Sequence, residues 1–122
     1  MPDMIEIRGL RALGVIGVCP EERERLQPFE LDIDLEADLS KAGESDDLHD
    51  TIDYGVAVAV AEKVVQTEQH LLLERVVQRI AEDLLVLEHV DGVRITIRKV
   101  RPPLPQDVNT SGVTIVRRRR PG

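Results

Sequence analysis

The clearest pattern in the chain is a strict alternation of apolar and acidic residues over positions 29–39. Every second residue from Phe29 to Leu39 is apolar, and each residue between them is Asp or Glu. A period of two is typical of a strand with one buried face and one polar face. Strands of about five or six residues are usual, so this longer alternation predicts a large, curved antiparallel sheet.

Shorter segments supply the partners of this strand. Residues 4–13 and 93–98 alternate branched apolar residues with charged or polar ones, and residues 112–118 form a further apolar segment. The segments 18–27 and 102–105 contain prolines and are predicted as loops.

Two helices are predicted between the second and third strands. Residues 55–66 carry Val56, Val60 and Val64 at four-residue spacing, and residues 70–87 carry an apolar stripe. This order predicts an α+β fold, in which an antiparallel four-stranded sheet carries both helices on one face. The charged face of the sheet is predicted either to meet water or to contact another subunit.

Composition and charge argue against several classes of protein. The chain has 122 residues, the size of one domain, a net charge of -7 and 2% aromatic residues, which is not typical of a nucleic-acid binder. It shows no signal peptide and no membrane span, and the single Cys19 cannot form an internal disulfide; these features predict a cytoplasmic protein without a membrane partner. The basic end, Arg117–Arg120, is either a solvated terminus or a contact for an anionic ligand or nucleic acid.

Four residues carry groups suited to catalysis or binding, although each also has a purely structural interpretation. Lys99 continues the apolar series of its strand, so a partly desolvated amine is predicted on the helix-covered face, where it is a usable acid or base unless it reaches out to water. Glu74 lies in the first turn of the second helix, where it can accept two parallel N–H bonds or simply complement the helix dipole. Tyr54 can relay protons or pack, and Glu22 lies in a charged loop where most glutamates are solvated.

Several short motifs occur together in a recognisable order. They are Gly14–Val18 followed by Glu22 and Gln27, Ser45–Asp47 with Asp50–Tyr54, Leu72–Val76 with Ile80 and Ala81, and Lys99 with Pro103–Pro105. Over nearly the whole chain this arrangement resembles the dihydroneopterin aldolase family, although many members carry Tyr-His where this chain has Val15 and Ile16. The resemblance implies a single domain over residues 1–122.

The same resemblance implies the tunnelling fold, a ββααββ unit. Four subunits would join their sheets into a ring-shaped barrel, and two rings commonly stack into an octamer. It implies a lyase of folate biosynthesis, without metal or cofactor, that cleaves 7,8-dihydroneopterin into 6-hydroxymethyl-7,8-dihydropterin and glycolaldehyde. The enzyme would also form the 2′ epimer, 7,8-dihydromonapterin. The pterin would lie between subunits, with Glu22, Glu74 and Lys99 from one chain and Tyr54, which relays a proton, from its neighbour.

Further residue roles follow from the resemblance. Glu74 and backbone groups of Leu73 and Ile52 would anchor the pterin ring. Lys99 would promote protonation at N5, and Glu22 would orient both Lys99 and the substrate hydroxyls. The three histidines are scattered rather than spaced as metal ligands: His49, His70 and His89.

Two alternatives stay open at this point. An epimerase acting on dihydroneopterin triphosphate would need cations near the pocket, and Arg23, Arg25 or Arg101 could supply them. A non-catalytic pterin or purine binder built on the same ring would need only Glu74 and backbone groups, because a fold does not determine a function.

Overall fold

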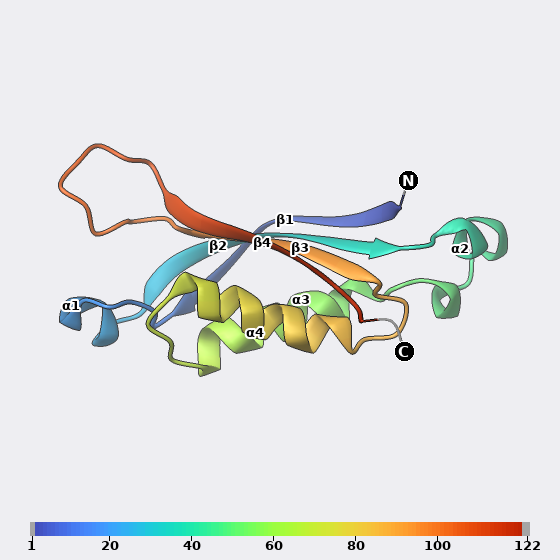
Figure 1. Ribbon diagram of the computed structural model, residues 1–122, viewed down its shortest axis with the longest axis horizontal. Helices are drawn as coiled ribbons and strands as arrows, with labels where there is room; N and C mark the ends of the chain where they lie inside the picture. Colours follow the sequence, from blue (N-terminus) through green and yellow to red (C-terminus); the bar gives the residue numbers. More distant parts are fainter. Residues whose placement is uncertain (1, 121–122) are drawn as a thin grey trace.

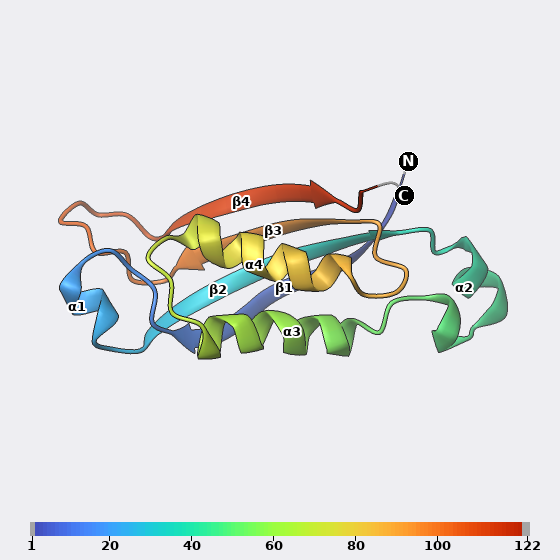
Figure 2. The same cartoon turned by 60° about the horizontal axis from the view of Figure 1, so that its bottom comes forward.

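Two layers make up the structure: a four-stranded antiparallel sheet and a pair of helices that cover one of its faces (Figure 1, Figure 2). The computed structural model describes residues 2–120. In chain order the elements are β1 (Asp3–Gly14), α1 (Pro20–Arg23), β2 (Gln27–Ala37), α2 (Ser40–Ser45), the 3-10 turn η1 (Leu48–Asp50), α3 (Tyr54–Thr67), α4 (Leu73–Leu85), β3 (Gly92–Lys99) and β4 (Ser111–Arg118). The strand order is β1-β2-β3-β4, which confirms the predicted α+β fold.

The alternation in β2 determines which face of the sheet is buried. Leu31 and Ile33 are fully buried and lie opposite the equally buried Ile97 and Ile95 of β3. Full burial of one such side chain contributes roughly 2 kcal/mol. Helix α4 completes the core: Leu73, Val77, Ile80 and Leu84 of the predicted apolar stripe are buried, and Val76 and Ala81 are buried beside them.

Helix α3 buries Ala57, Ala61, Val64 and Val65, so one member of its predicted valine stripe, Val64, is in the core. Ala57 and Ala61 are fully buried, whereas Val56, which its spacing assigned to the buried stripe, is 46% exposed. The helix also comes very close to β1: a Cβ added to Gly14 would lie only 2.5 Å from the carbonyl oxygen of Val65. The absence of a side chain at Gly14 therefore permits the close approach of this helix to β1.

Helix α4 is shorter than the sequence pattern predicts. It begins at Leu73, three residues after His70, and it ends at Leu85. His70 lies outside the helix because its carbonyl oxygen accepts a hydrogen bond from Gly17 N–H at 3.2 Å, and it forms a parallel β-bridge with Ile16. This bridge joins two segments that are far apart in the sequence, and local periodicity carries no information about it.

The uncovered face of the sheet carries charges that pair between strands. The closest pairs are Arg8 with Asp34 at 2.7 Å, Arg98 with Asp32 at 2.7 Å and Arg118 with Glu36 at 2.8 Å. Such cross-strand pairs favour one register of the sheet. None of the helices in the described part of the chain has the length and apolar character needed to cross a membrane.

The basic end is tied to the rest of the chain. Arg117 Nε donates to Gln78 Oε1 at 3.0 Å, and Arg119 Nε donates to the carbonyl oxygen of Leu85 at 3.1 Å. Leu85 is the last residue of α4, where carbonyl groups lack helical partners. Arg117 and Arg119 are exposed, as a solvated terminus predicts, but both also fasten β4 and its extension to α4.

Candidate active site

A buried ion pair forms the centre of the site. Lys99 is the last residue of β3, and its Nζ lies 2.7 Å from Oε2 of Glu22. The side chains are 15% and 5% exposed respectively, so the pair is largely shielded from water. The predicted inward placement of Lys99 is confirmed, and a charge-assisted hydrogen bond of this length is among the stronger ones in proteins.

Glu22 is buried because the segment around it is folded, which corrects two predictions. The segment contains the short helix α1, with Pro20 at its start, rather than only a loop. Gly17 backs the carboxylate so closely that a Cβ there would lie 2.4 Å from Cδ of Glu22. Gln27 Nε2 donates to the Glu22 carbonyl oxygen at 2.9 Å and holds the segment against β2. The charged neighbours of Glu22 in the sequence predicted a solvated side chain. That prediction is wrong because the contacts with Gly17 and Lys99 come from segments that the local sequence does not show.

Opposing effects act on the carboxyl of Glu22. Burial by itself would raise the pKa of Glu22, but the hydrogen bond and charge of Lys99, with hydrogen bonds from Cys19, hold this pKa below its ordinary value. Because the folded-state pKa is depressed, the pair stabilises the fold above the ordinary pKa of 4.5. That contribution is lost as the pH falls through the lower folded-state pKa.

A comparison with the Glu22→Gln variant tests this linkage. We expect the unaltered protein to lose more unfolding free energy than the variant between about pH 7 and pH 3, measured by urea denaturation. The other acidic groups are the same in both proteins, so the difference isolates Glu22. Equal losses over this range would contradict the depressed pKa.

Leu73 and Glu74 lie at the same end of the molecule as the ion pair. They open α4, and Leu72 before them makes no side-chain capping bond, so N–H groups of the first turn have no side-chain partner. The bridge between His70 and the segment at Gly17 brings this helix start beside the Glu22 segment. Leu72 is 50% exposed and Glu74 is exposed, so the helix start offers an apolar surface with a carboxylate and backbone donors.

Ile52 and Tyr54 lie at the opposite end. Tyr54 is the first residue of α3 and is 62% exposed, while Ile52 is buried. Helix α3 has 14 residues, a length of about 20 Å, and runs from this end toward the start of α4 (Figure 2), so Tyr54 and Glu74 lie toward opposite ends of the molecule. A single chain therefore does not bring Tyr54 to Lys99.

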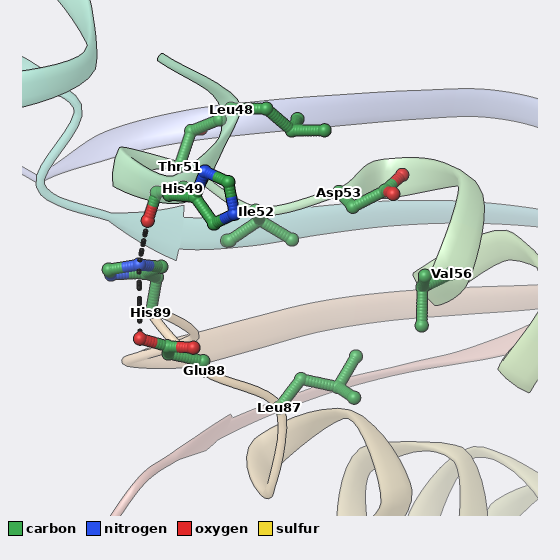
Figure 3. A pocket seen from close by; sticks show the side chains of 9 residues that line it. All are labelled: Leu48, His49, Thr51, Ile52, Asp53, Val56, Leu87, Glu88 and His89. Atoms are coloured by element: carbon green, nitrogen blue, oxygen red, sulfur yellow. Dashed lines mark hydrogen bonds and ion pairs between the residues drawn. The ribbon is translucent and has the colours of Figure 1, made fainter. Parts of the chain in front are cut away.

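The end that carries Tyr54 is hollowed (Figure 3). The hollow measures about 330 Å³ and lies between η1 and the turn after α4, lined in part by Thr51, Ile52 and Val56. His89 on that turn reaches η1, with its Nε2 at 2.9 Å from the carbonyl oxygen of His49. This hollow is remote from the ion pair.

Potential metal ligands do not gather within residues 2–120, where no group of three or more His, Cys, Asp or Glu side chains is placed to hold an ion.

The structure brings together Glu22 and Lys99, places Leu73 and Glu74 at the same end, and leaves Ile52 and Tyr54 at the other. Sequence reasoning assigned no role to Gly17 or Gln27, although both occur in the motif that carries the resemblance.

Comparison with known proteins decides the family. A family model described as FolB, dihydroneopterin aldolase, matches residues 5–116. The chain belongs to the dihydroneopterin aldolase family. It is 36% identical over 120 residues to the dihydroneopterin aldolase of Staphylococcus epidermidis, covering 96% of this chain and 98% of that protein. Over 117 residues it is 38% identical to the dihydroneopterin aldolase of Streptomyces coelicolor, with the same coverage of 96% and 98%.

Solved structures agree with this family. The E. coli dihydroneopterin aldolase in complex with neopterin matches with a TM-score of 0.86 at 31% identity, over 94% of this chain and 98% of that one. The chain is therefore an aldehyde-lyase of the dihydroneopterin aldolase type, and its fold is the tunnelling fold that the resemblance implied.

Proposed function

We propose that the active site of this aldolase is completed between two copies of the chain, where it cleaves 7,8-dihydroneopterin. The observation that carries the proposal is the split arrangement: Glu22, Glu74 and Lys99 lie at one end of the chain, and Tyr54 lies at the other (Figure 2). Head-to-tail contact would bring the two ends together, and contacts of this kind generate rings when the rotation closes.

The sheet edges support a ring. Strands β1 and β4 form the two edges of the four-stranded sheet, and neither has a strand partner on its outer side within residues 2–120. Joining β1 of one chain to β4 of the next would remove both edges, as in closed barrels. A four-membered ring, alone or stacked in pairs as an octamer, is the assembly that we propose.

The pterin ring would be anchored at the start of α4. The carboxylate of Glu74 can accept two parallel hydrogen bonds from the 2-amino group and N3–H of a pterin. The backbone of Leu73 would contribute a donor, and the backbone of Ile52 in the adjacent subunit would complete the anchor. The neopterin bound to the E. coli relative supports a ligand of this class.

The chemistry needs little beyond proton transfers. Retro-aldol cleavage requires an electron sink beside the breaking bond, and the substrate supplies it as the imine N5=C6. Lys99 would promote protonation at N5 and stabilise the developing charge, while Glu22 holds Lys99 and the side-chain hydroxyls. Tyr54 of the adjacent subunit would take the proton from the 2′ hydroxyl and return a proton to the enol carbon. No metal or cofactor has a role in this scheme.

The products would be 6-hydroxymethyl-7,8-dihydropterin and glycolaldehyde. Recombination after the aldehyde has rotated to present its opposite face would give the 2′ epimer, 7,8-dihydromonapterin.

The lone Cys19, with no possible internal disulfide partner, supports a cytoplasmic location. We infer a single domain over residues 1–122, in line with the family match over residues 5–116.

The proposal is tested by incubating the protein with 7,8-dihydroneopterin, oxidising the mixture and separating the fluorescent pterins. We expect a hydroxymethylpterin peak that grows with time and is unchanged by a chelator. A monapterin peak alone would favour the epimerase, which a parallel assay on the triphosphate would identify. Unchanged neopterin would contradict catalysis and favour the binding-only alternative.

Mixed assemblies test the split site directly. Assemblies made only of Lys99→Ala chains or only of Tyr54→Phe chains should have low activity, because every site then lacks one of its two catalytic groups. Co-expression should restore activity, since about a quarter of the interfaces in a random ring then combine an intact Lys99 end with an intact Tyr54 end.

The control is a mixture of Lys99→Ala with Glu22→Gln chains. Both changes lie at the same end of the chain, so no interface regains a complete site and activity should stay low. If the first mixture were as inactive as this control, the shared site would be contradicted.

A further inference from the structure

Three charged and polar side chains, Glu68, His70 and Arg79, form a cluster to which no role in binding or catalysis has been assigned. Glu68 follows α3, and its Oε1 accepts hydrogen bonds from His70 Nε2 at 2.9 Å and Arg79 Nε at 3.1 Å. Its Oε2 accepts from the Arg79 terminal nitrogen at 3.1 Å. The Arg79 contact is the two-pronged form that fixes geometry as well as charge. The hydrogen bond from His70, with those from Arg79, holds the pKa of Glu68 below its ordinary value.

This cluster holds the connection between α3 and α4. His70 lies in the middle of that connection. Of the residues between Glu68 and Leu73, all within the described part of the chain, only His70 has a side chain that forms a hydrogen bond. Arg79 lies on α4 itself. The cluster therefore ties the connection to the body of the helix that follows it.

Both parts of the site border this connection. On one side, the His70 carbonyl oxygen accepts a hydrogen bond from Gly17 N–H at 3.2 Å, and Gly17 lies against the Glu22 carboxylate. On the other side, the connection runs directly into Leu73 and Glu74. Figure 2 shows it passing beside the segment that leads to α1.

We propose that Glu68 and His70 are positioning residues, which set the start of α4 at the correct distance from the Glu22–Lys99 pair. The inference rests on the proposed function, because it concerns the pterin anchor and the proton donor as one site. An error of about 1 Å in such placement can cost about a hundredfold in rate. Neither side chain needs to touch the pterin for this effect.

Two substitutions at His70 separate positioning from packing. His70→Ala removes the donor to Glu68, whereas His70→Gln keeps an amide donor at a similar reach. We expect the dissociation constant for neopterin to rise about tenfold in His70→Ala and about twofold in His70→Gln, together with a fall in kcat for 7,8-dihydroneopterin. Fluorescence titration and steady-state kinetics provide the two readouts.

A matched pair of acidic residues supplies the control. Glu82 also binds Arg79, with its Oε1 at 3.1 Å from the Arg79 terminal nitrogen, but it lies on the body of α4 away from the connection. We expect Glu68→Ala to weaken neopterin binding as His70→Ala does, and Glu82→Ala to leave neopterin binding and kcat unchanged. Thermal unfolding of each variant measures the stability that each loses.

Three results would overturn the inference. The first is normal binding and turnover in His70→Ala. The second is an equal loss in His70→Gln and His70→Ala, and the third is an equal loss in Glu82→Ala and Glu68→Ala, which would indicate helix stability instead. If Glu68→Ala does not fold, the comparison of His70→Ala with His70→Gln still tests the inference. An unaltered protein that neither binds nor cleaves a pterin would overturn the proposed function and the inference together.

Discussion

Replacing Lys99 with alanine should lower kcat for 7,8-dihydroneopterin by about a thousandfold, the scale of a positioned proton donor. Among residues 2–120, Lys99 is the one cationic side chain that forms an ion pair with the buried Glu22, with its Nζ 2.7 Å from the carboxylate. Its loss removes the group proposed to stabilise charge at N5. The affinity for neopterin, the oxidised form of the substrate, should change much less, because Glu74 and backbone groups hold the ring.

Steady-state kinetics and a neopterin titration measure these two effects. The substitution also leaves Glu22 buried without its partner, so the kinetics must be recorded well below the melting temperature of the variant. Lys63→Ala is the matched control, because Lys63 is an exposed lysine on α3 and its loss should leave kcat unchanged. Near-normal turnover in Lys99→Ala would contradict the role given to Lys99.

Replacing Glu74 with alanine should weaken neopterin binding by about a hundredfold or more. Two hydrogen bonds to a charged acceptor contribute roughly 1.5–3 kcal/mol each, and alanine replaces neither. The carboxylate is exposed at the start of α4, so its removal should cost little folding stability. Fluorescence titration measures the affinity, and kcat at saturating substrate should fall less than in Lys99→Ala.

Glu74→Gln gives a finer test of the same contact. An amide offers one acceptor and one donor where the pterin edge presents two donors, so binding should lie between that of alanine and that of the unaltered protein. Unaltered neopterin affinity in Glu74→Ala would show that the pterin is anchored elsewhere.

Local patterns predicted the elements and one part of the site. The alternation in β2 predicted a half-buried strand, and Leu31 and Ile33 are indeed fully buried. The same period of two carried forward along β3 predicted that Lys99 points to the helix-covered side, where it meets Glu22. These predictions succeed because side-chain direction along a strand depends only on the backbone repeat.

Local patterns failed where distant segments meet. Glu22 lies in a charged segment and yet is buried, because Gly17 leaves room for its carboxylate and Lys99 reaches it from β3. The predicted second helix began at about His70, but the bridge between His70 and Ile16 keeps His70 out of α4. In each case a contact across the fold outweighs the preference of the local sequence.

The sequence by itself determined the α+β class, the family motifs and the chemical groups of the candidate site, because periodicity and residue type are properties of short segments. The family resemblance implied that Glu22 orients Lys99, but only the tertiary structure decided that the two form a buried ion pair, since 77 residues separate them along the chain. It also decided that Tyr54 lies a helix length away from Glu74, because α3 runs between the two ends of the molecule. Distances of this kind arise from packing, which the order of residues does not display.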